Sequence, residues 1–343
     1  MADIAQFSRS STSPKQPRDF HFHFEEAGCF CGATNTIGAV SCRDELTGDL
    51  YTYRRCASCR AERLSPRPTR DVIGGYYPDN YACHNVRSNS LAQRFKRLLV
   101  LAFHAPDNRL GWWRPLLRLF LYPLRGHTVF AFRPVEPRRI FEFGAATGND
   151  LALFRADGWE VCGCEPSTRA CAIAAERGIM LTNCAAEGVE LAHAAFGAVL
   201  LNNVLEHTHD PASVVAASWR GLAPGGSLVL VVPNHDGPSP RLFGAAWPGY
   251  DAPRHLWGFT PASLCALLQR TGFEPPRVYP MFQGVWAWEG SVDGRRSAVP
   301  VPRWRRLCAR PLAFLLYPVG VLLAMCGSGD FITVVATKPA TIR

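Results

Sequence analysis

This 343-residue chain has few cysteines, no apolar run at its beginning and no apolar stretch as long as a membrane span. Each of these absences narrows the class of protein to which it can belong. The 13 cysteines are too few for a disulfide scaffold, and several, such as Cys162 and Cys164, fall within apparent core elements, so we expect a reducing, cytoplasmic setting. Residues 1–20 contain no apolar run, so we expect a disordered leader rather than a secretory signal or a membrane anchor. The apolar stretch Pro311–Cys326 has 16 residues, fewer than the roughly 20 that a membrane span needs, which predicts a buried or interfacial helix pair interrupted at Pro318.

Lysine is scarce as well, since Lys15, Lys96 and Lys338 are the only ones and nearly all positive charge is arginine. The formal net charge of +9 would favour nucleic acid, anionic lipid or a phosphorylated substrate as a partner. The alternative is an ordinary solvated surface that reflects genome composition. With 48% hydrophobic and 19% charged residues the composition is that of a globular protein, so disorder is expected only at the ends.

A cysteine-bearing segment occupies residues 21–70. Two cysteine pairs, Cys29 with Cys31 and Cys56 with Cys59, face each other across an expected hairpin, which is the arrangement of a small zinc ribbon. The second pair has the standard C-x-x-C spacing, whereas the first is one residue short. The alternative is four ordinary thiols without metal. Substitute ligands for zinc would be His21, His23 and Cys42.

Residues 71–135 combine arginines with apolar side chains at helical intervals, which predicts a linker or cap of amphipathic helices. Such helices would pack on the core. Alternatively, they would rest on an anionic membrane, peripherally at its inner face, with Trp112 and Trp113 at headgroup depth. The prolines expected to break these helices are Pro106, Pro115 and Pro123.

Strands and helices alternate over residues 136–343, with a helical insertion at about 285–328. This alternation predicts a doubly wound, Rossmann-like α/β domain with helices on both faces of a parallel sheet. A ligand crevice is then expected at the carboxyl ends of the strands. The expected strands are 138–143, 160–165, 179–182, 198–203, 227–234, 277–282 and 331–337.

A turn with two glycines, GAATG, follows the first of these strands, in the stretch IFEFGAATGND. The dinucleotide fingerprint G-x-G-x-x-G, counted from Gly144, would need glycine at the positions of Ala146 and Asn149. A nicotinamide cofactor is therefore disfavoured.

A second pattern, acid-x-Gly-x-Gly-x-Gly, is met at Glu142, Gly144 and Gly148, and Ala146 is its one departure. This pattern also expects an acid at the end of the next strand, where a carboxylate can accept both hydroxyls of a ribose. Glu165 ends the segment EVCGCE at that place.

Together with LNNVLEHTHDPASVVAASWRGLAPGGSLVLVVPN and PRHLWGFTPASLCALLQRTGF, these residues resemble the class I S-adenosylmethionine-dependent methyltransferases. The resemblance is to the small-molecule branch, which includes ubiquinone-type O-methyltransferases and bacterial glycan or natural-product methyltransferases. It covers roughly residues 28–336, because similar proteins also carry a Cys-rich N-terminal element and a YYPDNY-like segment. It implies a seven-stranded sheet, mostly parallel, whose last strand is antiparallel.

The resemblance also implies a cofactor site for S-adenosylmethionine. Its turn would wrap the methionine end of the cofactor, Glu165 would hold the ribose, and Asn202 and Asn203 would lie beside the sulfonium. Ala146 would add a methyl group where backbone and ligand approach closely, and a positive φ there would be unfavourable. The implied residues of the turn are Glu142, Gly144, Ala146 and Gly148.

Methyl transfer mainly requires alignment of the nucleophile with the methyl group, and a hydroxyl acceptor also benefits from a base. His207 in LEHTHDP and His255 in PRHLWGFT are the candidate catalytic bases. Either could instead be structural and bond to the backbone. Glu206 is expected to fix a loop or face a helix rather than to bind metal.

Three functions remain in competition. The leading one is O-methylation of a small molecule or of a sugar in a surface glycan or natural product, without nucleic acid as a partner. The second is a zinc-ribbon RNA methyltransferase, whose binding would fall with salt, although the Asn-Pro-Pro-aromatic motif of amino-directed nucleic-acid methyltransferases is missing. The third is a cofactor-binding or scaffold protein without turnover.

Overall fold

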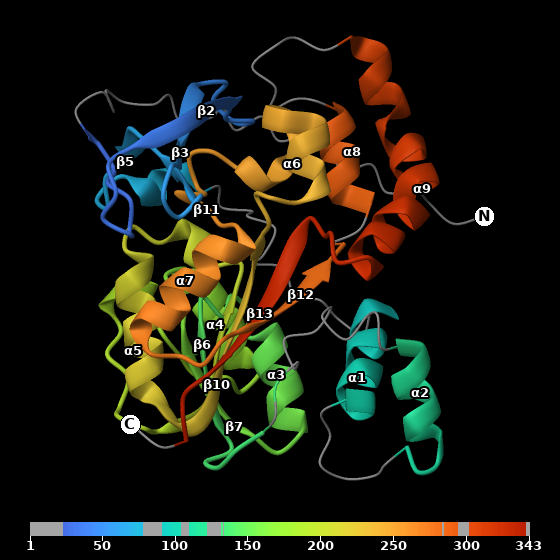
Figure 1. Ribbon diagram of the computed structural model, residues 1–343. Helices are drawn as coiled ribbons and strands as arrows, with labels where there is room; N and C mark the ends of the chain where they lie inside the picture. Colours follow the sequence, from blue (N-terminus) through green and yellow to red (C-terminus); the bar gives the residue numbers. More distant parts are fainter. Residues whose placement is uncertain are drawn as a thin grey trace.

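The computed structural model of this chain describes residues 23–77, 91–103, 110–121, 132, 134–282, 285–293 and 302–340. At its centre lies a seven-stranded sheet (Figure 1). Strand β13 is antiparallel to both of its neighbours and the other strands share one direction, which confirms the predicted Rossmann-like sheet. In spatial order the strands are β12 (Arg277–Met281), β13 (Phe331–Thr337), β10 (Leu222–Pro233), β9 (Phe196–Asn202), β6 (Arg139–Phe143), β7 (Glu160–Cys164) and β8 (Leu181–Thr182).

Helices cover both faces of this sheet, with α5 (Pro211–Gly221) and α7 (Pro261–Thr271) on one side and α3 (Asn149–Ala156) on the other (Figure 1). The sequence specifies where each begins. Asp210 accepts hydrogen bonds from the first turn of α5, and Thr260 forms a capping box with Ser263 at the start of α7. Helix α4 (Thr168–Glu176) begins in the same way at Ser167.

The core explains why the central strands read as continuous apolar runs. Every residue of β9 except Asn202 is buried, as expected for a parallel strand that is covered on both faces. Leu200 and Leu230 are fully buried, and each such side chain stabilises the fold by about 1.5–3 kcal/mol relative to exposure. The polar residues at the strand ends therefore differ from the apolar interior of the sheet and are candidates for a functional site.

The cysteine-bearing segment folds onto the carboxyl end of the sheet rather than apart from it. Strand β11 (Trp257–Gly258) pairs with β4 (Glu62–Leu64), so one strand of the N-terminal sheet comes from the second half of the chain. Tyr53 is fully buried, and its hydroxyl donates to the backbone oxygen of His255 at 2.6 Å. The remaining elements are β1 (Phe24–Glu25), β2 (Thr36–Arg43), β3 (Leu50–Cys56), β5 (Arg67–Pro68) and the 3-10 helix η2 (Ile73–Tyr76).

Two helices of the 71–135 region lie beside the domain, α1 (Leu91–Phe103) and α2 (Trp113–Leu121). The prediction that Pro115 breaks a helix is wrong, because this proline lies in the first turn of α2. A first-turn residue has no hydrogen-bond partner for its N–H within the helix, so proline is tolerated there. Pro106 and Pro123 lie outside the described residues.

The insertion forms α8 (Val285–Asp293) and α9 (Arg303–Met325). The prediction of an interruption at Pro318 is also wrong, because α9 continues through Pro311 and Pro318 as one helix of 23 residues. Its part Leu307–Met325 is long and apolar enough to cross a membrane by length and composition. The other short helices are α6 (Pro238–Phe243), η5 (Ala186–Gly188), η6 (Leu205–His207), η7 (Gly244–Ala246) and η8 (Pro248–Tyr250).

Candidate functional site

The turn after β6 has the backbone that its glycines allow. Gly144 and Gly148 adopt left-handed φ values of 59° and 70°. A Cβ at Gly144 would lie 2.6 Å from Val204 Cγ2, and one at Gly148 would lie 2.9 Å from Ile179 Cδ1. Both positions are therefore restricted to glycine by conformation and by space.

Ala146, the departure from the glycine pattern, has φ 47°, so the unfavourable conformation considered from the sequence is present. A non-glycine residue in this region costs roughly 1–2 kcal/mol. The backbone N–H of Ala146 donates to Glu165 Oε2 at 2.9 Å, and that of Ser167 donates to Glu165 Oε1 at 2.9 Å. Each carboxylate oxygen has a second lone pair, so Glu165 can still accept two hydroxyls from a ligand.

A cavity of about 800 Å³ opens at the carboxyl ends of β6, β7 and β9. Of the seven predicted cofactor residues, Gly144, Glu165 and Asn203 line it. Glu142, Ala146, Gly148 and Asn202 are not among its lining residues. Its lining is Arg70, Ile73, Gly74, Tyr77, Gly144, Glu165, Pro166, Ser167, Arg169, Ala185, Ala186, Glu187, Asn203, Val204, His207, Thr208 and His209.

The two asparagines at the end of β9 differ in role. Asn202 donates its side-chain amide to Asp150 Oδ2 at 2.7 Å, and so ties β9 to α3. Asn203 has φ 54°, a left-handed conformation that asparagine tolerates better than most residues. Its own amide donates to Asn202 Oδ1 at 3.0 Å. The chain therefore turns sharply at the cavity wall.

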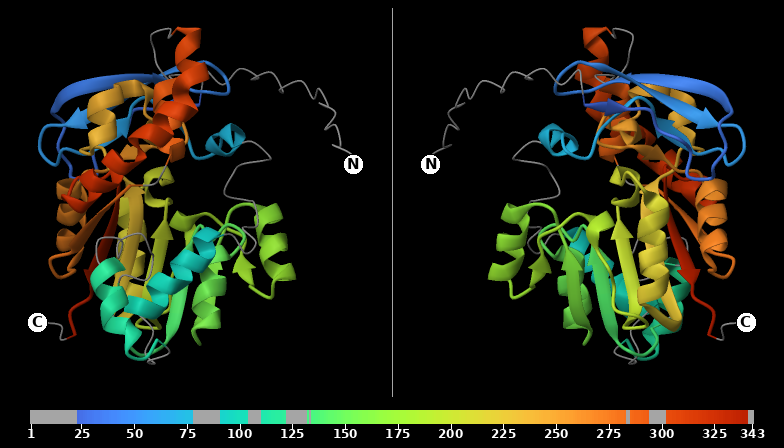
Figure 2. Two further views of the ribbon diagram at one scale, coloured as in Figure 1. Left: turned by 90° about the vertical axis from the view of Figure 1, so that its right-hand side faces the viewer. Right: turned by 90° about the vertical axis from the view of Figure 1, so that its left-hand side faces the viewer.

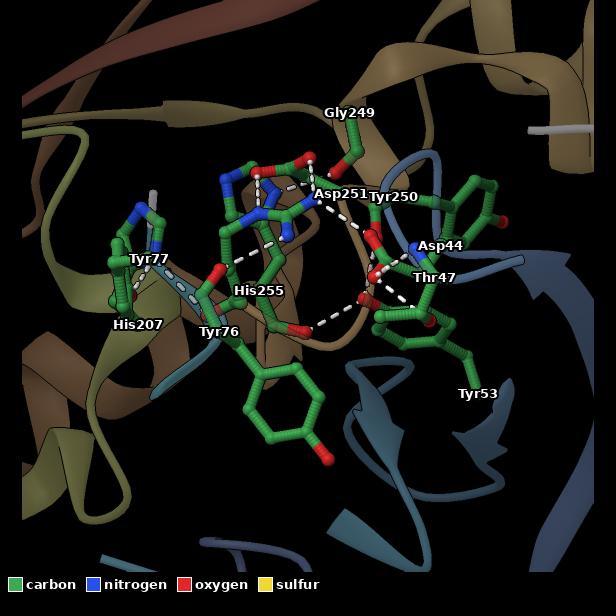
Figure 3. Close-up of polar contacts among 11 residues, drawn as sticks. Asp44, Thr47, Tyr53, Tyr76, Tyr77, His207, Gly249, Tyr250, Asp251 and His255 are labelled. Carbon is green, nitrogen blue, oxygen red and sulfur yellow. Dashed lines mark hydrogen bonds and ion pairs between the residues drawn. The ribbon is translucent and has the colours of Figure 1, made fainter. Parts of the chain in front are cut away.

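The N-terminal element, by which we mean residues 23–77, contributes four cavity residues that the sequence analysis did not identify. These are Arg70, Ile73, Gly74 and Tyr77. Of these four, only Tyr77 belongs to the YYPDNY segment, which the family resemblance included without a role. The Tyr77 hydroxyl lies 2.9 Å from His207 Nδ1 (Figure 3). The cavity is thus built jointly by the N-terminal element and the α/β domain.

His207 lines the cavity, whereas His255 stands behind it with its ring 4.6 Å away, edge to face. His207 Nδ1 lies 3.0 Å from the backbone oxygen of Arg254, and a carbonyl can only accept, so Nδ1 carries the proton. His255 Nδ1 is assigned likewise, from the Gly249 oxygen at 2.8 Å. Burial, with the neighbouring His255, lowers the pKa of His207 to about 3, and burial lowers the pKa of His255 to about 4. Both rings are neutral at physiological pH, with Nε2 as the acceptor.

Glu206 completes a buried group with these histidines. Its carboxylate oxygens have no hydrogen-bond partner among the described residues, and burial raises its pKa to about 8. Ligand atoms of Glu206, His207 and His255 all lie within 4.8 Å of one another. A proton or a divalent cation can neutralise this buried carboxylate. The expected role of fixing a loop falls to the backbone oxygen of Glu206, which accepts a hydrogen bond from the Leu256 N–H.

Arg254 of the α/β domain joins the N-terminal element to this domain beside the group of Glu206, His207 and His255, in a set of contacts that we call the clamp. Its guanidinium donates to Asp44 at 3.1 Å, to Asp251 at 2.8 Å and to the backbone oxygen of Tyr76 at 3.2 Å. Figure 3 labels these three acceptor residues. Arg254 and Asp44 are almost fully buried. Removing one partner from a buried pair of this kind typically costs 3–5 kcal/mol, so about this much stability depends on the clamp.

The four cysteines predicted as zinc ligands come together. Cys29 Sγ lies 3.4 Å from the Sγ atoms of Cys31 and Cys59, and Cys31 Sγ lies 3.6 Å from that of Cys56. Zn–S bonds of about 2.3 Å in a tetrahedron give S···S distances of about 3.8 Å, which this group fits. The short Cys29-x-Cys31 spacing is therefore no obstacle.

The three suggested substitute ligands take no part in this group. His23 pairs instead with Asp71 at 3.0 Å, and Cys42 is buried elsewhere on β2. His21 lies outside the described residues.

Comparisons with known proteins identify the family to which this chain is similar. Residues 116–276 match the family model of a methyltransferase domain. A ubiquinone biosynthesis O-methyltransferase of Cereibacter sphaeroides is 30% identical over 178 residues, which are 48% of this chain and 72% of that protein. An uncharacterized protein of Mycobacterium tuberculosis is 33% identical over 162 residues, which are 44% of this chain and 53% of that protein. The chain thus spans about half the length of the mycobacterial relative.

Solved structures resemble the chain more loosely. A SAM-dependent methyltransferase of Thermotoga maritima is 20% identical, with a TM-score of 0.44, over 72% of this chain and all of that one. One from Archaeoglobus fulgidus is 14% identical, with a TM-score of 0.43, over 66% of this chain and 94% of that one.

Proposed function

The chain belongs to the S-adenosylmethionine-dependent methyltransferases, and from this premise we propose that it methylates a hydroxyl group of a small molecule or of a sugar in a glycan or natural product. The observation that carries the proposal is a single cavity whose lining includes both a carboxylate at the end of β7 and a neutral histidine. Glu165 and His207 both line it. The named O-methyltransferase among the relatives supports oxygen as the accepting atom.

At the cofactor end, Glu165 is positioned by two backbone N–H groups before any ligand arrives. Such positioning reduces the entropy that a ligand must lose on binding. Gly144 and Asn203 line the same cavity. S-adenosylmethionine, when bound, supplies an electrophilic methyl group.

At the acceptor end, His207 Nε2 offers a lone pair toward a substrate hydroxyl. With S-adenosylmethionine bound, the hydroxyl proton would pass to His207 Nε2 as the oxygen formed its bond to the methyl carbon, and the electron pair of the broken carbon–sulfur bond would stay on sulfur. Tyr77 and the Arg254 backbone oxygen hold Nδ1, so the ring keeps one orientation. Because its pKa is low, His207 accepts the proton late, as positive charge on the acceptor oxygen grows.

We further propose that Cys29, Cys31, Cys56 and Cys59 bind a structural zinc ion. Their sulfur atoms have the separations of a tetrahedral site. A closed four-thiolate site leaves no open position for chemistry. The ion would brace the element that supplies Tyr77 to the cavity.

Two other functions are separable from this one by assay. An RNA methyltransferase would lose binding steeply with salt. A scaffold without turnover would bind S-adenosylmethionine and release no S-adenosylhomocysteine with any acceptor. The proposed enzyme releases S-adenosylhomocysteine with a hydroxylated aromatic or sugar acceptor and not with RNA.

Cofactor binding is tested by calorimetry with S-adenosylmethionine. A charged hydrogen bond contributes about 1.5–3 kcal/mol, so Glu165→Ala should weaken affinity at least tenfold. The matched control is Glu160→Ala, at the exposed start of the same strand, which should leave affinity unchanged. Equal affinities for wild type and a folded Glu165→Ala variant would remove the cofactor assignment.

A further inference from the structure

Helix α9 exposes large apolar side chains and buries small ones, which is unusual for a helix on a protein surface that contacts only water. The buried residues of the face that packs on the domain are small, with Leu316 and Val321 partly buried beside them, and most of the other large apolar side chains are exposed. An ordinary surface helix buries its large apolar residues and exposes polar ones. The buried small residues are Ala309, Ala313, Gly320 and Ala324, and the large apolar residues that are at least half exposed are Trp304, Leu307, Phe314, Leu315, Leu322 and Met325.

The small-residue face fixes α9 closely to its neighbours. A Cβ at Gly320 would lie 2.5 Å from the Phe282 ring, and Ala313 and Ala324 share a buried cluster with Phe282 and Trp288 of α8. One side of α9 is therefore covered by protein along most of its length. A helix held in this way cannot be surrounded by lipid, so we do not interpret its apolar length as a membrane span.

The charge on α9 has one sign. The segment Arg303–Gly329 contains no Asp or Glu, and four arginines lie at its beginning next to Trp304. Tryptophan and arginine together are typical of the membrane interface, where the indole lies at headgroup depth and the guanidinium meets phosphate. These arginines are Arg303, Arg305, Arg306 and Arg310.

A second apolar and basic surface lies on the same side of the molecule. The left view of Figure 2 shows α9, in orange-red, and the teal helices α1 and α2 facing the viewer together. Trp112, Trp113, Leu119 and Phe120 are more than half exposed there, with Arg118 between them. The two surfaces give this side an unusual amount of exposed large apolar side chain.

From these observations we infer that α9 lies in the surface of an anionic membrane, with its exposed large apolar side chains among the acyl chains and the positive charge of its first turns attracted to the lipid phosphates. Anionic lipid meets both the apolar face and the positive charge. A second copy of this chain, joined through α9, would bring the same arginines and no acid from that helix. The inference does not depend on methyl transfer.

Vesicle flotation of the full chain tests this inference. The protein should float with vesicles of phosphatidylcholine and phosphatidylglycerol, bind vesicles of phosphatidylcholine alone much more weakly, and be released from the anionic vesicles by high salt. The double variant Phe314→Glu, Leu315→Glu should bind anionic vesicles at least tenfold more weakly. Arg310→Gln should weaken binding severalfold at low salt.

The matched control is Met180→Glu, because Met180 is a 75% exposed apolar residue on the connection between α4 and β8. It should float as the wild type does. Circular dichroism and S-adenosylmethionine affinity establish that each variant is folded. Equal flotation of the α9 variant and the wild type would overturn the inference, as would a wild-type dimer in light scattering that the α9 variant converts to monomer.

Discussion

Tyr77 of the N-terminal element and His207 of the α/β domain meet at the cavity wall, with the tyrosine hydroxyl 2.9 Å from His207 Nδ1. The contact spans 130 residues of sequence. It means that the ring expected to accept the proton is oriented by a part of the chain outside the methyltransferase sheet. The N-terminal element is therefore part of the wall of the proposed acceptor site and not only an attachment to the domain.

Tyr77→Phe should lower kcat roughly fivefold to tenfold, because one hydrogen bond of about 1 kcal/mol that orients His207 is lost. Its affinity for S-adenosylmethionine should be unchanged, since Glu165 is unaffected. The control is Tyr76→Phe, whose hydroxyl does not line the cavity. Steady-state kinetics with the identified acceptor would contradict this role if both variants lost kcat equally.

Ala146→Gly should preserve the fold and leave the affinity for S-adenosylmethionine equal or better. Glycine relieves the φ of 47° but adds chain entropy to the unfolded state, so the two effects on stability nearly cancel. Ala194→Gly is the matched control, because Ala194 has φ 53° and does not line the cavity. Calorimetry should detect any gain in affinity only at position 146, and weaker binding by Ala146→Gly would contradict the strain argument.

Removal of zinc should loosen the N-terminal element. One equivalent of zinc is expected in protein purified without chelator, and Cys56→Ser with Cys59→Ser should abolish it and make residues 23–77 more sensitive to protease. Cys308→Ser with Cys326→Ser, at two exposed thiols, should retain the metal. Elemental analysis that finds no zinc in the wild type would remove the ribbon.

Glu206 should make stability depend on pH in a direction opposite to the buried histidines. Its folded pKa of about 8 lies above the ordinary 4.5, so the stability it contributes is present below pH 4.5 and is lost as pH rises toward 8. Glu206→Gln, measured with chelator, should remove this loss. Denaturant unfolding across that range checks it, with exposed Glu176→Gln as the control. An unchanged pH slope in Glu206→Gln would contradict a protonated Glu206.

Much of the α/β domain was predictable because its signals are local. Alternating strands and helices, the capping residues at Asp210 and Thr260, and the glycines at 144 and 148 each act within a few residues of themselves. The same holds for Glu165, whose place at the end of a strand beside the turn follows from parallel topology. The glycine turn and Glu165 led to the cofactor half of the cavity, whereas the caps at Asp210 and Thr260 were recognised only in the structure.

The acceptor half could not be predicted because its contacts are long in sequence. Arg254 meets Asp44 across 210 residues, and no local pattern marks either residue as a partner of the other. For the same reason His207 and His255 could not be ranked from their motifs. Only the packing of η2 against the domain places His207 in the cavity and His255 behind it.

The course of α9 was mispredicted for a different reason. Proline lowers helix stability locally by about 3 kcal/mol, but contacts along a whole helix can outweigh that cost. The buried alanines of α9 supply such contacts. The rule that proline interrupts a helix therefore fails where tertiary packing holds both sides of the proline.

The pairing of β4 with β11 bears on how such an enzyme could change its acceptor. Glu62 of β4 also lies 2.9 Å from the buried His235, so the N-terminal element shares buried polar contacts with the α/β domain. An exchange of this element between relatives would leave buried polar groups without their partners. We therefore expect acceptor choice to change by substitutions on both sides of the contact between the N-terminal element and the α/β domain, such as Tyr77 and His207 together, rather than by exchange of the whole element.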